Sequence, residues 1–407
     1  MKKNKEENEK LKNEGDIYSV LESVALNWKI LGVIIFTTRG EVGNRKYIIK
    51  KSLVAYNIFL SFLVSISSYD VIFFNGSLRY QTSKKLEFDA KLLIHIKEAF
   101  NIISLLEMTV WKLITINKFK KMLECFAKQD KIVNEIGSHI NYRADMKQIK
   151  IFIRLVTIIN LLLSFQEVYY GISVSTLIDW TNWWLPSLIY KSNLSLFFCL
   201  VWILGMRFKV LNQKLNLIVK STHPQSFENM KVLRIIANTH CQLCKIGKKI
   251  IIIFFPSLVL CGIQTFIFVT LMLYRLILDI KQQKGIITIV NNMFGIFITG
   301  AQIIIIVFIC NWTTKKASFP EKLIHEIKIN QLNPAFFEMI QSFSTQLLHE
   351  KLIFSVGGLF TLDSALLQAV AGAITTYLVI FIQFGNMEKI FADCENSVSK
   401  NLSKSAT

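Results

Sequence analysis

The stretch IIIFFPSLVLCGIQTFIFVTLMLY, residues 251–274, decides the fold class of this chain. It carries no charged side chain, and as a helix it is long enough to cross the hydrocarbon core of a bilayer, which takes about 20 residues. The stretch 286–310 is equally free of charge and ends in the almost purely aliphatic run Ile303–Ile309. Two such stretches predict an integral membrane protein.

Five further apolar runs lie outward from this pair, at 52–74, 92–114, 151–173, 188–206 and 365–384. The run 92–114 gives the weakest signal, because charged side chains such as Glu98, Glu107 and Lys112 interrupt it. Hydrophobic residues make up 52% of the 407 and charged residues 18%, with only 5 prolines and 17 glycines, which favours long helices over turns. We predict an all-α, multi-pass protein of the plasma membrane with seven transmembrane helices.

The distribution of basic residues predicts the orientation. With the N-terminus in the cytoplasm, the inner segments hold 33 lysines and arginines and the outer segments 11, as the positive-inside rule requires. The C-terminus then lies outside, where the glycosylation sequons at Asn75 and Asn401 also fall. Because these blocks alternate with apolar runs, the net charge of +19 indicates contact with membrane lipid and not with nucleic acid.

Residues 1–51 are predicted to form a cytoplasmic N-terminal segment. Its stretch 17–36 suits either an amphipathic helix on the inner membrane face or a buried helix of the cytoplasmic domain. Residues 52–310 would hold spans one to six, whose helices continue into the cytoplasm because residues 117–150 and 207–249 keep helical apolar spacing. Residues 311–364 would form a further cytoplasmic segment, 365–384 the last span, and 385–407 an outer tail.

Signatures of enzymes and cofactors are absent from the sequence. It has no glycine-rich phosphate loop, no H-E-x-x-H and no G-x-S-x-G. The cluster His240-Cys241-Gln242-Leu243-Cys244 lacks a second group to complete a zinc site, so packed cysteines are the favoured interpretation. We therefore expect no catalytic residue, no metal and no cofactor.

Polar and aromatic side chains gather in the outer halves of several spans. Charge at membrane depth usually faces a cavity, so these residues indicate a ligand pocket open to the outside. The aromatic members suit an interfacial belt equally well. The predicted pocket residues are Glu98, Asn101, Glu167, Tyr169, Tyr170, Trp183, Trp184, Gln264, Asn291 and Asn292.

The last span separates into two stripes. Residues seven apart nearly coincide on a helix, so Thr376 and Gln383 share one stripe, while Tyr377 and Phe384 form a bulkier one beside it. The small and polar stripe suits close helix packing or the wall of a pore that a neighbouring large side chain closes by dewetting. Periodicity leaves both alternatives open.

The same residues carry a family resemblance. Thr376-Tyr377, five apolar residues and Gln383-Phe384 match the TYhhhhhQF signature that insect gustatory receptors have at the end of their final span. The run-up from Gly358 to Asp363 is also similar to theirs, although the motif-level match covers only about residues 355–384.

The resemblance implies a ligand-gated, non-selective cation channel opened by an extracellular tastant. Receptors like these assemble as homotetramers or heteromers around a pore lined by the final helix, with Gln383 and Phe384 at the gate. A cytoplasmic anchor domain holds their subunits together, and residues 311–364 would be the anchor segment here. Leu378 replaces the glutamate usual after the Thr-Tyr pair in the sugar branch, which disfavours that branch. The alternatives are a seven-span G-protein-coupled receptor, which would need its N-terminus outside, and a small-molecule transporter, for which internal repeats are missing.

Overall fold

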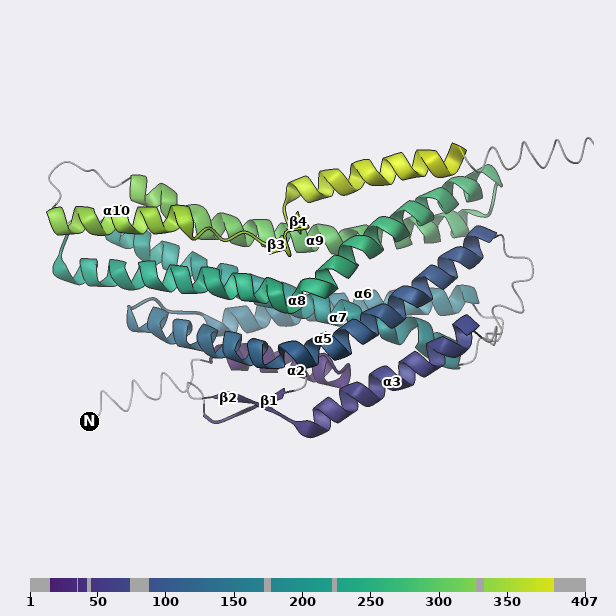
Figure 1. Ribbon diagram of the computed structural model, residues 1–407, viewed down its shortest axis with the longest axis horizontal. Helices are drawn as coiled ribbons and strands as arrows, with labels where there is room; N and C mark the ends of the chain where they lie inside the picture. Colours follow the sequence, from purple (N-terminus) through teal and green to yellow (C-terminus); the bar gives the residue numbers. More distant parts are fainter. Residues whose placement is uncertain are drawn as a thin grey trace, which may run out of the picture.

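In the computed structural model, the protein consists of long helices that run side by side (Figure 1). It describes residues 15–34, 36–41, 45–73, 88–171, 177–221, 225–326 and 333–383, without the side chains of 63–73, 88–95, 97–98, 161–171 and 177–184. The tail after Gln383, with Phe384 and Asn401, lies outside the described residues, as does Asn75.

Seven helices contain the seven predicted spans, apart from one or two residues at the ends of three of them. In chain order they are α3 (Lys51–Phe73), α5 (Phe88–Glu135), α6 (Tyr142–Gly171), α7 (Leu177–Val219), α8 (Phe227–Lys281), α9 (Ile286–His325) and a last helix, Ser364–Gln383. Within the described residues, α5, α7, α8, α9 and the last helix are each long and apolar enough to cross a membrane. The predicted all-α, seven-helix membrane fold is confirmed.

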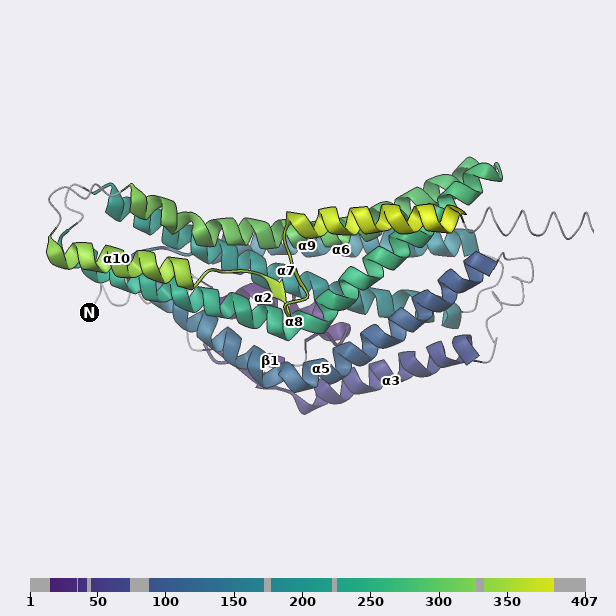
Figure 2. The same cartoon turned by 45° about the horizontal axis from the view of Figure 1, so that its top comes forward.

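The helices extend well beyond the length that a bilayer requires. The 55 residues of α8 measure about 80 Å at about 1.5 Å per residue, against a core of about 30 Å. At the end where α8 begins, α10 (Pro334–His349) packs against α8 and α9. At the opposite end the helices spread apart, and the last helix lies along this half (Figure 2). The predicted helical extension of spans two to six is present.

Helix α2 (Ile17–Ile30) is buried against α5 and α6 through the face that carries Ile17, Leu21 and Trp28. This face of α2 is therefore packed inside the protein. The helix also ends six residues earlier than the predicted stretch 17–36. Gly32 follows in the left-handed region at φ +66°, where a side chain would be strained.

Two short antiparallel hairpins accompany the helices, and neither was predicted. The first pairs β1 (Phe36–Arg39) with β2 (Lys46–Ile49) just before α3. The second pairs β3 (Ser355–Val356) with β4 (Phe360–Thr361) between α10 and the last helix.

A buried ion cluster holds α5, α6 and α7 together on the α10 side of the molecule. Arg207 donates to Asp130 through Nε at 2.8 Å and to Asp145 through Nη1 at 2.6 Å. The hydroxyl of Tyr142 donates to Asp130 at 3.1 Å, and its ring lies under the guanidinium. Such a cluster fixes the mutual positions of three helices, because each buried charge needs its partner.

Candidate ligand cavity and pore helix

Helix α8 bends near its middle, where Pro256 interrupts the backbone ladder (Figure 1). Proline removes a backbone donor and clashes with the preceding turn, so helices kink there. Side chains of neighbouring helices hydrogen-bond the carbonyls around the bend. Trp111 Nε1 of α5 donates to the Ile253 carbonyl at 2.9 Å, and the Tyr190 hydroxyl of α7 donates to the Ser257 carbonyl at 3.0 Å. The bend is therefore anchored from two sides.

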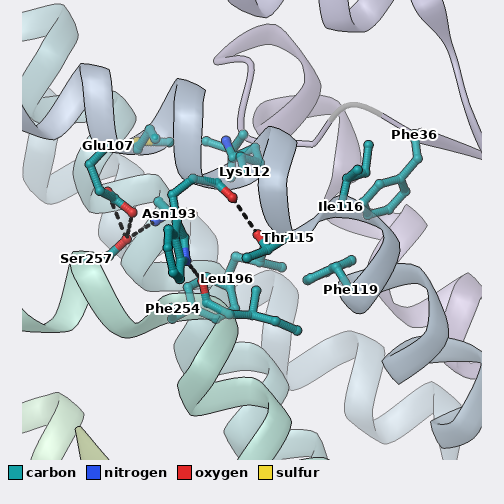
Figure 3. A pocket seen from close by; sticks show the side chains of 14 residues that line it. Phe36, Glu107, Lys112, Thr115, Ile116, Phe119, Asn193, Leu196, Phe254 and Ser257 are labelled. Atoms are coloured by element: carbon teal, nitrogen blue, oxygen red, sulfur yellow. Dashed lines mark hydrogen bonds between the residues drawn. The ribbon is translucent and has the colours of Figure 1, made fainter. Parts of the chain in front are cut away.

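A cavity of about 40 Å³ lies beside this bend, between α5, α7, α8 and the segment that leads into β1 (Figure 3). One water needs about 10–15 Å³ on this measure, so the cavity has room for about three. The residues that shape it most are Phe36, Glu107, Trp111, Lys112, Phe119, Asn193, Phe254 and Ser257. It is aromatic over much of its wall and carries both a carboxylate and an ammonium.

A chain of hydrogen bonds crosses one wall of this cavity, as the dashed lines in Figure 3 show. Asn193 Nδ2 donates to Ser257 Oγ at 2.8 Å. Ser257 in turn donates its single hydroxyl hydrogen to Glu107, whose two oxygens lie 2.9 and 3.0 Å away. A carboxylate has about four acceptor positions, so Glu107 keeps capacity for further donors from water or a ligand.

Lys112 connects the cavity to the N-terminal segment. Its Nζ donates to the Gly32 carbonyl at 3.1 Å, and Asn57 Nδ2 of α3 donates to the same oxygen at 2.6 Å. A Cβ on Gly32 would lie only 2.8 Å from Asn57 Nδ2. Glycine is therefore required here by both its backbone angle and the close approach of α3.

The four predicted pocket residues whose side chains are described do not line this cavity. Asn101 is buried in α5 with no hydrogen-bond partner for its Nδ2 in the described part of the chain, and Gln264 is half-buried in α8. Asn291 and Asn292 lie in the second turn of α9, where Asn292 Nδ2 donates to Asp279 at 2.6 Å and helps to join α9 to α8. The side chains of Glu98, Glu167, Tyr169, Tyr170, Trp183 and Trp184 lie outside the described residues.

The β3–β4 hairpin rests on α8 at the same bend. Gly357, at the hairpin turn, lies so close to the Phe255 ring that an added Cβ would come within 2.3 Å of it. Residues two apart on a helix point to nearly opposite sides, at about 200°. Phe255 and Ser257 therefore place the hairpin and the cavity on opposite faces of α8.

The hairpin leads directly into the last helix. Asp363 caps its first turn by accepting from the backbone N–H groups of Ala365 at 3.0 Å and Leu366 at 3.2 Å. The Thr361 hydroxyl, at the end of β4, donates to the other Asp363 oxygen at 2.6 Å. Hairpin and last helix are thus joined by a short polar link.

The last helix contacts α8 through two aromatic pairs. The Tyr377 ring lies 5.4 Å from that of Phe266, and the Phe381 ring lies 5.8 Å from that of Tyr274, measured between centroids. None of the apolar window of this helix is buried in the chain, and Thr376 and Gln383 are exposed. The Thr376 hydroxyl donates to the Gly372 carbonyl at 3.0 Å, which satisfies its hydrogen within the helix.

Comparison with known proteins agrees on one family. The family described as 7tm chemosensory receptor matches residues 27–388. Putative gustatory receptor 28b of Drosophila melanogaster is 36% identical over 74 residues, which are 18% of this chain and 16% of that protein. Gustatory receptor for bitter taste 66a of the same species is 29% identical over 157 residues, 37% of this chain and 29% of that protein. The aligned parts thus span less than a third of these two relatives.

A solved structure shows the same fold over nearly the whole chain. The insect olfactory receptor OR5 from Machilis hrabei, in complex with eugenol, superposes with a TM-score of 0.65. The superposition covers 89% of this chain and 97% of that one, at 12% sequence identity.

Proposed function

The chain belongs to the 7tm chemosensory receptor family, that of the insect gustatory receptors, and on this premise we propose that it is a subunit of a tastant-gated, non-selective cation channel. It is a multi-pass membrane receptor and not an enzyme. The channel activity, the kind of tastant and the assembly form the proposal.

The exposure of the last helix is the observation that carries the proposal. A 20-residue apolar helix with no buried side chain in its own chain needs further cover from lipid or from other subunits. Four copies around an axis, as a homotetramer or with related receptors, would bring the exposed Thr376 and Gln383 stripe to a central pore. Tyr377 packs against Phe266 of α8 in its own subunit, and the family motif assigns Phe384 as the large apolar side chain that closes that pore.

The orientation belongs to the same proposal. The N-terminal segment and α10 would lie in the cytoplasm and anchor the subunits, and the splayed half of the helices would face the outside. The basic residues support this placement, since residues 1–51 and the long segments beside α10 hold most of them.

A bitter-type tastant is favoured over a sugar. Two of the curated relatives are gustatory receptors for bitter taste, and Leu378 departs from the sugar branch. The ligand opens the channel only if it binds the open conformation more tightly than the closed one.

Cysteine accessibility tests the pore. Thr376→Cys and Gln383→Cys should each make the tastant-evoked current sensitive to a cationic thiol reagent applied from outside. Leu378→Cys, about 200° away from Thr376 on the helix, is the matched control and should stay insensitive, as should the wild-type protein with its seven native cysteines. Equal sensitivity at all three positions would refute the pore-lining role.

A second experiment separates the channel from a G-protein-coupled receptor. Epitope tags at the two ends, probed on intact cells, should be accessible at the C-terminus only. Current through the purified receptor in a lipid bilayer, without any G protein, should appear on addition of a bitter compound from a panel that also contains sugars. An accessible N-terminal tag would overturn the orientation.

A further inference from the structure

The β1–β2 hairpin presents a basic outer face. Alternate residues of a strand point to opposite sides, and in β2 the side chain of Tyr47 is buried while those of Lys46 and Ile48 are exposed. Lys50 continues the exposed side just beyond β2, and Lys51, also exposed, begins α3. The hairpin therefore leads into the first membrane-spanning helix through a row of cations.

Arg39 of β1 and Lys46 of β2 face each other across the hairpin. Arg39 pairs directly with Lys46 in the strand register, and like charges in that position destabilise a sheet. In the described part of the chain neither forms an ion pair, whereas the neighbouring Arg45 binds Glu22 at 3.1 Å. Both cations are therefore available to an anion from outside the chain.

An exposed apolar surface adjoins the basic face. Leu26 and Ile30 of α2, one helical turn apart, are 69% and 57% exposed. The Tyr56 hydroxyl of α3 donates to the Ile30 carbonyl at 2.7 Å, which fixes this end of α2 at the first turns of the span. Because the opposite face of α2 packs against the protein core, Leu26 and Ile30 point away from the core.

The height of the surface relative to the membrane follows from α3. Its exposed apolar side chains include Ile58, Phe59 and Phe62. Lys51 precedes Ile58 by seven residues, or about 10 Å along a helix. That distance places Lys50 and Lys51 at the level of the lipid headgroups when Ile58 lies in the hydrocarbon.

We propose that Arg39, Lys46, Lys50 and Lys51 bind the headgroups of anionic phospholipids, while Ile48, Leu26 and Ile30 enter the adjoining interface. Basic side chains next to exposed apolar ones, continuous with a membrane span, suit a charged leaflet better than a soluble acidic partner. This surface is separate from the cavity and from the last helix, so the proposal does not depend on channel activity.

Native mass spectrometry of the full-length receptor, given equal amounts of phosphatidylserine and phosphatidylcholine, tests the proposal. The wild-type protein should prefer phosphatidylserine, and the preference should fall about five-fold for each basic side chain removed in R39Q/K46Q. K231Q/R234Q removes the same charge at the start of α8, about 30 Å along the helix from residue 251, and should keep the wild-type preference.

K50Q provides a variant outside the paired strands, in case the hairpin substitutions unfold β1–β2. It should lose about five-fold on its own. The proposal is overturned if R39Q/K46Q and K50Q both keep the wild-type lipid preference, or if K231Q/R234Q loses as much as R39Q/K46Q.

Discussion

Ser257 of α8 donates its hydroxyl to Glu107 of α5, at 2.9 Å from one carboxylate oxygen and 3.0 Å from the other. The bond lies one residue beyond Pro256, on the face of α8 opposite to Phe255, which carries the β3–β4 hairpin. A movement of α8 at this bend therefore affects the cavity and the base of the last helix together. If the proposed function holds, this arrangement would connect the cavity to the last helix, and the first and last predictions below test the two sides of α8.

Replacing Ser257 by alanine should weaken the contact between α5 and α8. The substitution removes the hydroxyl from a carboxylate that otherwise has few donors, at a cost of about 1–3 kcal/mol. We expect a lower thermal midpoint for purified S257A and a changed tastant concentration for half-maximal current. S257T restores a hydroxyl and should recover most of both. A midpoint for S257A equal to that of the wild-type protein would show that the bond contributes nothing.

Removing Arg207 should destabilise the receptor much more strongly. R207M leaves Asp130 and Asp145 buried without their shared cation, and breaking one partner of such a cluster costs about 3–5 kcal/mol. Thermal unfolding and the yield of monodisperse protein measure the effect.

The exposed pair Lys248–Glu350 is the matched control for this prediction. Its nitrogen and oxygen also lie close together, at 3.1 Å, but water reaches both side chains. K248M should therefore cost less than about 1 kcal/mol. Similar losses for R207M and K248M would contradict the argument that burial sets the difference.

Hydropathy predicted the helices well because the membrane imposes a simple requirement. A run such as 251–274 must form a helix in lipid to satisfy its own backbone groups, so length and apolarity determine the element. The helical apolar spacing of residues 117–150 likewise predicted that the helices continue there, and in the structure α5 runs on to Glu135 and α6 begins at Tyr142.

The hairpins and the cavity depend on contacts between distant residues, which periodicity does not report. Strands as short as Ser355–Val356 carry no pattern, and the cavity is formed by Glu107, Asn193 and Ser257 from three helices. Glu107 was recognised as a charge at membrane depth, yet the predicted pocket drew on residues nearer the splayed end. A rule that paired each such charge with a proline bend in another span would have found it.

The link between Thr361 and Asp363 should appear in the acid stability of the receptor. The Thr361 hydroxyl, followed by the backbone N–H groups of Leu366 and Ala365, lowers the pKa of Asp363 below its ordinary value of 3.8. A lowered folded-state pKa adds stability above the unfolded value, and that stability is lost as pH falls through the folded value. T361V should therefore melt below the wild-type protein above pH 3.8, and the difference should vanish at lower pH.

T345V is the control for this pH dependence. Thr345 is also a hydroxyl donor, but it donates to the Gln341 carbonyl of its own helix at 2.9 Å and touches no titrating group through that bond. Its effect on the thermal midpoint should be the same across the acid range. A pH-independent difference for T361V as well would refute the role of Asp363.

Two adjacent glycines allow the contact between the β3–β4 hairpin and Phe255 to be tested separately from backbone strain. Gly357 and Gly358 both have positive φ angles, +57° and +76°, so alanine is strained at either position. A Cβ added to Gly357 would lie 2.3 Å from the Phe255 ring, whereas a Cβ added to Gly358 would have nothing within 4 Å.

G357A should therefore lift the hairpin from the bend of α8 and displace the last helix. We expect altered current without ligand in G357A, measured in the same cells as G358A, which should show only the smaller effect of strain. Since both variants share the strained angle, equal currents in the two would mean that contact with Phe255 does not position the last helix.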